Sequence, residues 1–102
     1  MKQYTAADLE RDIEQRDLKF LQPIRLDRGR RYGTDEDVLA NVAAFGWPGA
    51  VISAMECQMR LNNMAKALMA GVAPREDDLL DACRDLTNYS HYIEILYDRS
   101  KI

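Results

Sequence analysis

The sequence predicts an all-α protein, built as a compact bundle-like domain of four helices. Apolar residues recur at spacings of three and four in four separate segments, which is the period of an amphipathic helix. No segment shows the alternation of apolar and polar residues that is typical of a strand. Proline and glycine fall between the four segments, where they separate one predicted helix from the next.

Composition indicates one globular domain that spans residues 1–102. The chain has 47% hydrophobic and 30% charged residues, which argues against disorder, and its net charge is -3. This acidic balance makes duplex nucleic acid an unlikely partner. No apolar run approaches the roughly 20 residues of a membrane span, and charged sequence follows the first residues, so we expect a cytoplasmic protein with no membrane partner.

The first predicted helix lies at the periphery, within residues 5–22. Thr5 is a candidate N-cap, and Asp8 follows three residues later, as in a capping box. Its apolar residues form a single stripe amid many charges, so this helix is expected to cover another element. Pro23 is predicted to end the helix, and residues 23–34 are predicted to form a loop.

The helical core is predicted over residues 35–100. A short helix is expected from Asp35 to Phe45 after an N-cap at Thr34, and a turn at residues 46–49 places Pro48 first in the next helix. That third helix, about residues 49–70, is apolar on nearly every side, so it is expected to be central. Gly71 is expected to close it.

The last predicted helix runs from about residue 75 to residue 99. Its apolar residues recur at spacings of three and four and are expected to face the core. This predicted core stripe comprises Leu79, Cys83, Leu86, Tyr89 or Ser90, Ile93 and Leu96. Cys57 and Cys83 are interpreted as small buried hydrophobic residues, because no CxxC motif exists and His91 is the only histidine.

The same helix carries an acidic stripe formed by Asp78, Asp81, Asp85 and Asn88. The spacing of three, four and three residues places these side chains on one face, where like charges repel. A cluster of carboxylates on a rigid helix suits Mg²⁺ or Mn²⁺ together with phosphate oxygens. The alternative is a solvated or ion-paired acidic surface, and the helix dipole alone can account for Asp78.

Two further polar groups are candidates for ligand binding. Glu56 and Arg60 are four residues apart on the third helix, so they can pair along it, face the acidic stripe, or do both. In the second case Arg60 or Lys66 would hold an anionic ligand. Arg30 and Arg31 lie in the predicted loop beside Tyr32; these residues are either solvated, or they grip phosphate while the tyrosine stacks on a base.

Three motifs together resemble a known family. They are Arg30-Arg31-Tyr32-Gly33, the segment from Glu56 to Leu61, and the segment from Asp78 to Tyr89. In this combination the chain resembles the phage-type nucleotide-modification-associated domains, which are similar to the MazG-like all-α NTP pyrophosphohydrolases. The resemblance covers roughly residues 28–96.

The resemblance implies a four-helix core in a homodimer or homotetramer, and cleavage of a nucleoside triphosphate to a monophosphate and pyrophosphate. Asp81 and Asp85 would be catalytic residues that hold Mg²⁺ or Mn²⁺, with Glu56 as a third. Arg60 and Lys66 would face phosphates, while Asn88 and Tyr89 would border the base or sugar. The residues Arg30, Arg31 and Tyr32 would complete the substrate site.

The chain departs from this family at its acidic pairs. Those enzymes carry an ExxE pair followed by an ExxD pair, whereas here Glu10 and Glu14 are four residues apart and Glu56 is followed by Arg60. Four carboxylates with matching spacings cannot be assembled. The alternative function is therefore a non-catalytic helical protein that binds a nucleotide or serves as a protein-interaction oligomer.

Overall fold

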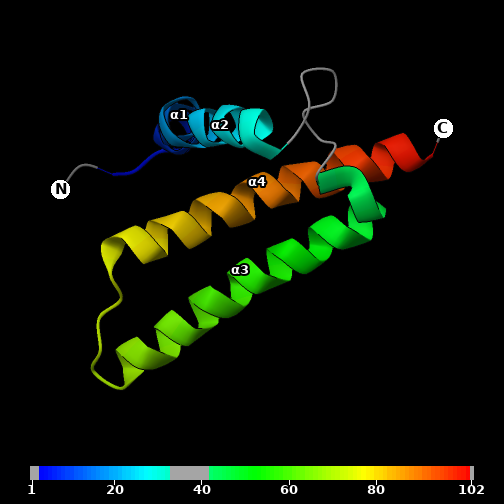
Figure 1. Cartoon of the computed structure of the whole chain (residues 1–102). Helices are drawn as coiled ribbons and strands as arrows, with labels where there is room; N and C mark the ends of the chain where they lie inside the picture. The colour runs from blue at the N-terminus through cyan, green and yellow to red at the C-terminus, as the bar shows by residue number, and fades with distance from the viewer. Residues whose placement is uncertain (1–2, 33–41, 102) are drawn as a thin grey trace.

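All regular structure in the described part of the chain is helical, which confirms the all-α prediction. The computed structural model describes residues 3–32 and 42–101, and Figure 1 shows their arrangement. The elements in chain order are α1 (Ala6–Arg16), the π-helix η1 (Asp17–Leu21), α2 (Gln22–Tyr32), the 3-10 helix η2 (Val42–Phe45), α3 (Gly46–Met69) and α4 (Glu76–Ser100).

The long helices α3 and α4 lie side by side, and α4 occupies the middle of the molecule (Figure 1). The N-terminal arm, which we define as α1, η1 and α2, covers the other side of α4 through contacts from η1. The prediction that the third helix is central is therefore wrong. An apolar pattern shows that a helix has faces to bury, but it does not show which neighbour covers each face.

The arm begins as predicted and continues further than predicted. Thr5 and Asp8 form a capping box, in which the Asp8 backbone N–H donates to Thr5 Oγ1 at 3.1 Å and the Thr5 N–H donates to Asp8 Oδ2 at 2.9 Å. The loop predicted over residues 23–34 is wrong for residues 23–32, because helical structure extends to Tyr32, and residues 33–34 lie outside the described part of the chain. The predicted helix end at Pro23 is wrong for the same reason.

A π-turn explains how the helix passes this proline. The Gln22 N–H donates to the carbonyl oxygen of Asp17, five residues earlier, so the backbone is widened immediately before Pro23. Proline is tolerated in the first turn of a helix because its missing N–H has no partner to lose there. Pro23 is the second residue of α2, so it begins a new α-helical turn after η1.

The start of the second half of the chain is described only in part. The helix predicted from Asp35 to Phe45 lies mostly outside the described residues, and its last four residues form η2. Residues 46–49, predicted as a turn, form the first turn of α3. Pro48 is tolerated there because backbone N–H groups in the first turn have no partner within the helix. Gly46 has a φ of 67°, a conformation that glycine adopts without strain.

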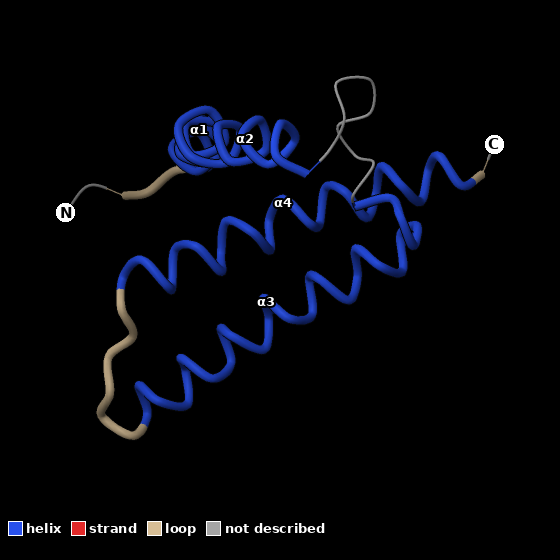
Figure 2. Tube along the Cα trace, in the orientation of Figure 1, coloured by secondary structure: helices blue, strands red, loops and turns tan. Residues whose placement is uncertain are grey.

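The end of α3 follows the prediction. Gly71, with a φ of 91°, stands one residue after the helix C-cap. The Val72 N–H donates to the Ala67 carbonyl at 2.8 Å and the Gly71 N–H donates to the Leu68 carbonyl at 3.0 Å, which is the Schellman arrangement. The chain then crosses to α4 through the loop that Figure 2 draws in tan.

The described part of the chain has a small core. Its buried hydrophobic residues are Ala50, Cys57, Ala82 and Leu96. Leu79, Leu86, Tyr89 and Ile93 of the predicted core stripe are partly buried. Cys83 is exposed, which corrects the prediction that both cysteines are buried, and both thiols are free. No described helix is both long and apolar enough to cross a membrane.

Candidate functional site

The acidic stripe of α4 is not a uniform surface, because its second half is buried. Asp85 and Asn88 are 6% and 3% exposed, and they are the buried polar residues of the described chain. Asp78 is exposed and lies in the first turn of α4 with two other acidic residues, which supports the helix-dipole interpretation for that residue. The stripe therefore divides into an exposed beginning and a buried end.

Arg25 of the arm holds Asn88 in place. Its guanidinium donates to both carboxylate oxygens of Asp17, at 2.7 and 3.3 Å, and to Asn88 Oδ1 at 3.1 Å. The Asn88 amide also donates to the Leu21 carbonyl at 3.4 Å. The hydrogen bonds from Arg25 hold the pKa of Asp17 below its usual range. Asn88 thus joins α4 to the arm at η1.

Arg28 lies three residues further along α2 and approaches Asp85 in the same way. Its Nη1 is 3.1 Å from Asp85 Oδ1. Because Asp85 and Asn88 are also three residues apart, the two arginines on α2 match the two polar residues on α4. Sequence reasoning placed Arg25 and Arg28 in a loop and so missed this match, although their spacing of three residues was a usable signal.

The carboxylate of Asp85 remains incompletely satisfied. Arg28 is ion-paired with Oδ1, but no well-aligned hydrogen bond from the described residues reaches this buried oxygen. Burial raises the pKa of Asp85, as does the negative charge of Asp81, while the positive charges of Arg28 and Arg60 lower it by less. A buried carboxylate is costly unless charges and hydrogen bonds fully compensate it, and Arg28 compensates Asp85 only in part.

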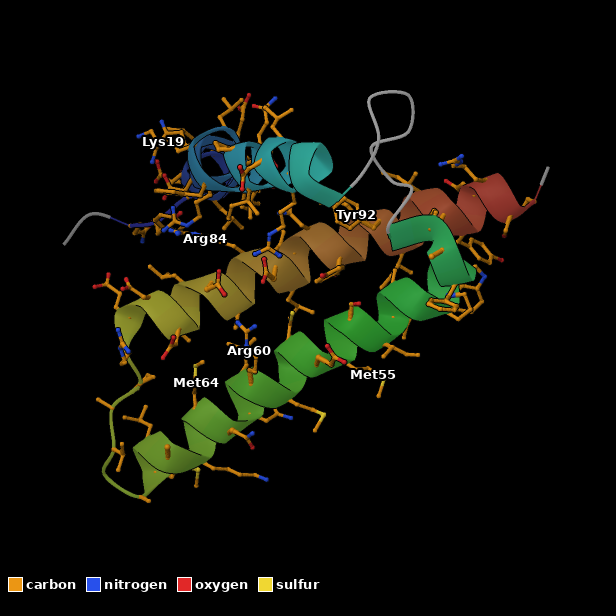
Figure 3. All side chains as sticks on the ribbon, in the orientation of Figure 1. Lys19, Met55, Arg60, Met64, Arg84 and Tyr92 are labelled. Carbon is orange, nitrogen blue, oxygen red and sulfur yellow. The ribbon has the colours of Figure 1, made fainter. Side chains whose placement is uncertain are left out.

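Arg60 connects α3 to the other aspartate. Its Nη2 lies 3.2 Å from Asp81 Oδ2, and Figure 3 shows Arg60 pointing from α3 towards α4. Both side chains are about half exposed, so the pair is solvated. In the structure, Arg60 therefore faces the acidic stripe.

The thiol of buried Cys57 is influenced by the charged groups of this region. Burial raises the pKa of its thiol, and the next largest effect comes from the charge of Asp85, with smaller effects from Arg60, Glu56 and Asp81. Glu56 is exposed and directly precedes Cys57 on α3. Across residues 3–32 and 42–101, however, no group of three or more His, Cys, Asp or Glu side chains is placed to hold a metal ion.

The other predicted site residues lie elsewhere or are engaged differently. Lys66 follows Met59 by seven residues on α3, so it shares the face of that exposed methionine and points away from α4. Tyr89 is half-buried and packs edge-on against Tyr92, with ring centroids 5.9 Å apart. Residues 30–32, predicted as loop, form the last turn of α2, and their side chains lie outside the described part of the structure.

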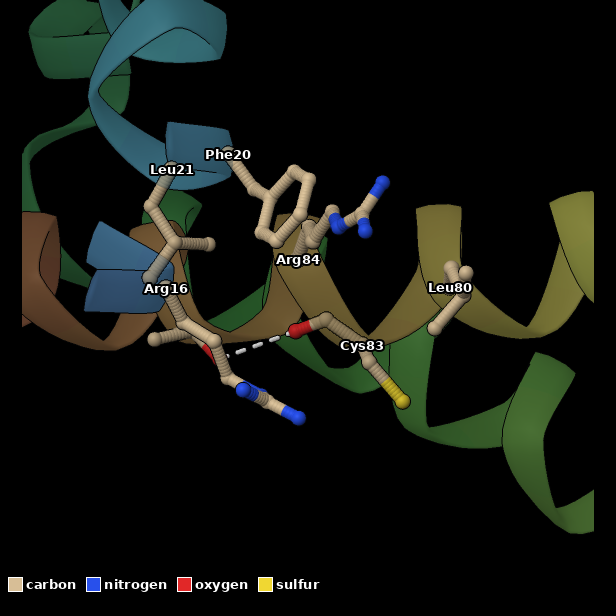
Figure 4. Close-up of a pocket in the computed structure, with 7 residues that line it drawn as sticks. Arg16, Phe20, Leu21, Leu80, Cys83 and Arg84 are labelled. Carbon is tan, nitrogen blue, oxygen red and sulfur yellow. Dashed lines mark hydrogen bonds between the residues drawn. The ribbon is translucent and has the colours of Figure 1, made fainter. Parts of the chain in front are cut away.

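A hollow on another face of α4 is lined by residues of η1 and its neighbours (Figure 4). The lining residues are Arg16, Phe20, Leu21, Leu80, Cys83, Arg84 and Thr87. The Arg84 guanidinium stacks 4.2 Å from the centre of the Phe20 ring, which fixes both side chains. The hollow contains no carboxylate, so it provides no hard ligand for a divalent metal ion.

The comparisons with known proteins identify no relative of this chain. No family model, curated protein or solved structure matches the chain. The groups that the structure brings together are two carboxylates of α4, Asp81 and Asp85, and the arginines that face them from α2 and α3.

Proposed function

We propose that this chain binds a nucleoside triphosphate together with Mg²⁺ or Mn²⁺ and cleaves it to a monophosphate and pyrophosphate. The observation that carries the proposal is the buried Asp85 carboxylate, which lies one helical turn from Asp81 and is ion-paired with Arg28 without a well-aligned hydrogen bond to its Oδ1. The resemblance described above implies the same pair of residues. It also implies an assembly of two or four copies, and the proposal includes this together with the cytoplasmic location expected from the sequence.

The carboxylates fit a metal that also binds phosphate oxygens. Mg²⁺ is usually held by one or two carboxylates, with substrate phosphates and waters completing its coordination. Asp81 and Asp85 provide such a pair, and exposed Glu56 is the candidate third acidic group. A metal ion held there neutralises phosphate charge and lowers the pKa of the attacking water.

The arginines have a second role in this proposal. Arg28 and Arg60 neutralise Asp85 and Asp81 in the structure. With a metal ion on the carboxylates, Arg28 and Arg60 would be available to bind the phosphates, which arginine binds well. Water attacks the α-phosphorus, the bond to the bridging oxygen breaks, and pyrophosphate leaves. We therefore expect metal and nucleotide to bind together, with each alone binding weakly.

Pyrophosphate release from a panel of canonical and modified dNTPs with Mg²⁺ or Mn²⁺ tests the activity. We expect release by the wild type and a loss of at least about 100-fold in Asp81→Asn and Asp85→Asn, because each removes a ligand of the metal. Asp78→Asn is the matched control, since Asp78 is an exposed aspartate of the same helix. Absence of release from every nucleotide, with all three variants equal to wild type, contradicts the catalytic proposal.

A second candidate function is nucleotide binding without turnover. It is favoured by the absence, within the described residues, of a third acidic side chain close enough to complete a metal cluster. This function predicts that nucleotide plus metal raises the melting temperature while no pyrophosphate appears. The shift should exceed the sum of the shifts with each alone, and no shift from any combination contradicts both functions.

A further inference from the structure

The outward face of α3 carries a row of exposed apolar side chains. We call Ile52, Met55 and Met59 the outer stripe; their spacing of three and four residues places them on one face, and they are 59%, 57% and 60% exposed. Figure 3 shows Met55 on the side of α3 away from α4, whereas Arg60 and Met64 point towards α4. Neither α4 nor the arm covers the outer stripe.

The whole chain exposes more surface than a compact monomer. Its accessible surface is 8043 Å², compared with about 5,900 Å² for a compact protein of the same mass. Its radius of gyration is 16.0 Å, compared with about 13 Å for a compact domain of this length. Each chain of an obligate dimer removes about 1,000–2,500 Å² from water, and an arrangement as open as this one leaves surface for such an interface.

The core of a single chain is also small for its length. In the described residues no large side chain is fully buried, and two of the four buried hydrophobic residues are alanines. Burial of apolar area is the main favourable contribution to folding, at about 25 cal/mol per Å². A chain that leaves the isoleucine and methionines of its longest apolar helix in water forgoes much of that contribution.

We infer that a second copy of this chain packs on the outer stripe through its own outer stripe, and that the two copies fold as one unit. An interface with two-fold symmetry brings the same patch of both copies together, so a charged patch would repel itself, whereas an uncharged apolar patch is self-complementary. Asn62 and Lys66 continue the same face, which confines the apolar contact to the first half of α3. The inference rests on the oligomeric part of the proposed function and is independent of nucleotide binding.

Light scattering on the wild type tests the assembly. We expect at least twice the chain mass of 11.7 kDa, and a melting temperature that rises with protein concentration because unfolding and dissociation are coupled. A mass of one chain at micromolar concentration, with a melting temperature independent of concentration, overturns the inference. That result leaves the nucleotide assays unaffected, so the two failures are distinguishable.

Met55→Glu tests the face. It places two like charges near the proposed two-fold axis, and we expect the mass to fall at least two-fold. Leu18→Glu is the matched control, because Leu18 is an equally exposed leucine (57%) on the arm, and its mass should equal that of the wild type. An assembly that survives Met55→Glu overturns the assignment of the outer stripe.

A charge-pairing experiment covers the case in which Met55→Glu fails to fold. Met55→Lys is prepared in parallel, and the two variants are mixed in denaturant and refolded together. We expect the mixture to recover helical structure and twice the chain mass, because opposite charges then meet across the axis, while each variant refolded alone does not. A mixture that behaves like its separate components overturns the inference.

Discussion

The two long helices differ in the polar residues that one buries and the apolar residues that the other exposes. α4 buries Asp85 and Asn88, whereas α3 leaves Ile52, Met55 and Met59 in water. The difference follows from what each helix faces: α4 meets arginines of α2 on one side and α3 on the other, whereas neither α4 nor the arm covers the outer side of α3. Burial in this fold therefore depends on the partner available to each face rather than on hydrophobicity alone.

The largest effect on stability is expected at Asn88. Asn88→Ala removes the acceptor of Arg25 and the donor to Leu21 at a site that is 3% exposed, so buried groups lose their partners. We expect a loss of about 2–3 kcal/mol in the free energy of unfolding, measured by urea denaturation.

Asn62→Ala is the control for that prediction. Asn62 is an exposed asparagine on α3 whose side chain accepts only from Gln58, and its replacement should change stability by no more than about 0.5 kcal/mol. Equal losses in the two variants would show that Asn88 does not join the arm to α4. They would also contradict the contrast drawn between the buried residues of α4 and the exposed residues of α3.

A gain in stability is expected at Asp85. Asp85→Asn removes a buried charge whose Oδ1 accepts no hydrogen bond from the described residues, and Arg28 is exposed enough to be solvated without it. We expect the free energy of unfolding at pH 7 to rise by about 1 kcal/mol, or about 4–8 °C in melting temperature. The same substitution should remove pyrophosphate release, since functional carboxylates are often held at a cost in stability.

Asp81→Asn separates the buried from the exposed carboxylate. Asp81 is half exposed and pairs with half-exposed Arg60, so its loss should change stability by less than about 1 kcal/mol, and by nothing measurable in high salt. Thermal melts of both variants with and without 0.5 M NaCl provide the comparison. A destabilised Asp85→Asn, or a salt-independent loss in Asp81→Asn, would mean that the pair with Arg28 outweighs the burial of the charge.

Local features of the fold were predictable from the sequence. Thr5 with Asp8, and Gly71 at the end of α3, occupy positions whose chemistry depends only on nearby backbone. The continuation past Pro23 was not predictable in this way, because a π-turn is rare and leaves no distinctive residue pattern. The central place of α4 was missed because periodicity identifies an apolar face without naming its neighbour.

The candidate site was predictable in part for a related reason. Helical spacing placed Asp81 and Asp85 on one face, and the expected approach of Arg60 to that face is observed. The burial of Asp85 could not be inferred, because it depends on Arg25 and Arg28, which were assigned to a loop. Lys66 was grouped with Arg60 by chemistry, although its seven-residue spacing places it on the face of Met59, which is exposed in the structure.

The smallest expected effect is the pH dependence contributed by Asp17, which differs from Asp85 in being satisfied by Arg25. Its pKa is lowered in the folded chain, so the stability it contributes is fully present above the unfolded value of about 3.9 and is lost as pH falls through the folded value. Asp17→Asn should therefore reduce the melting temperature at pH 6 but not near pH 2. The reduction is expected to be small because the Asp17 side chain is 39% exposed. Asp98→Asn, at an exposed carboxylate 3.9 Å from Lys101, should have no effect at either pH; an equal reduction there would show that Arg25 gives Asp17 no special stability.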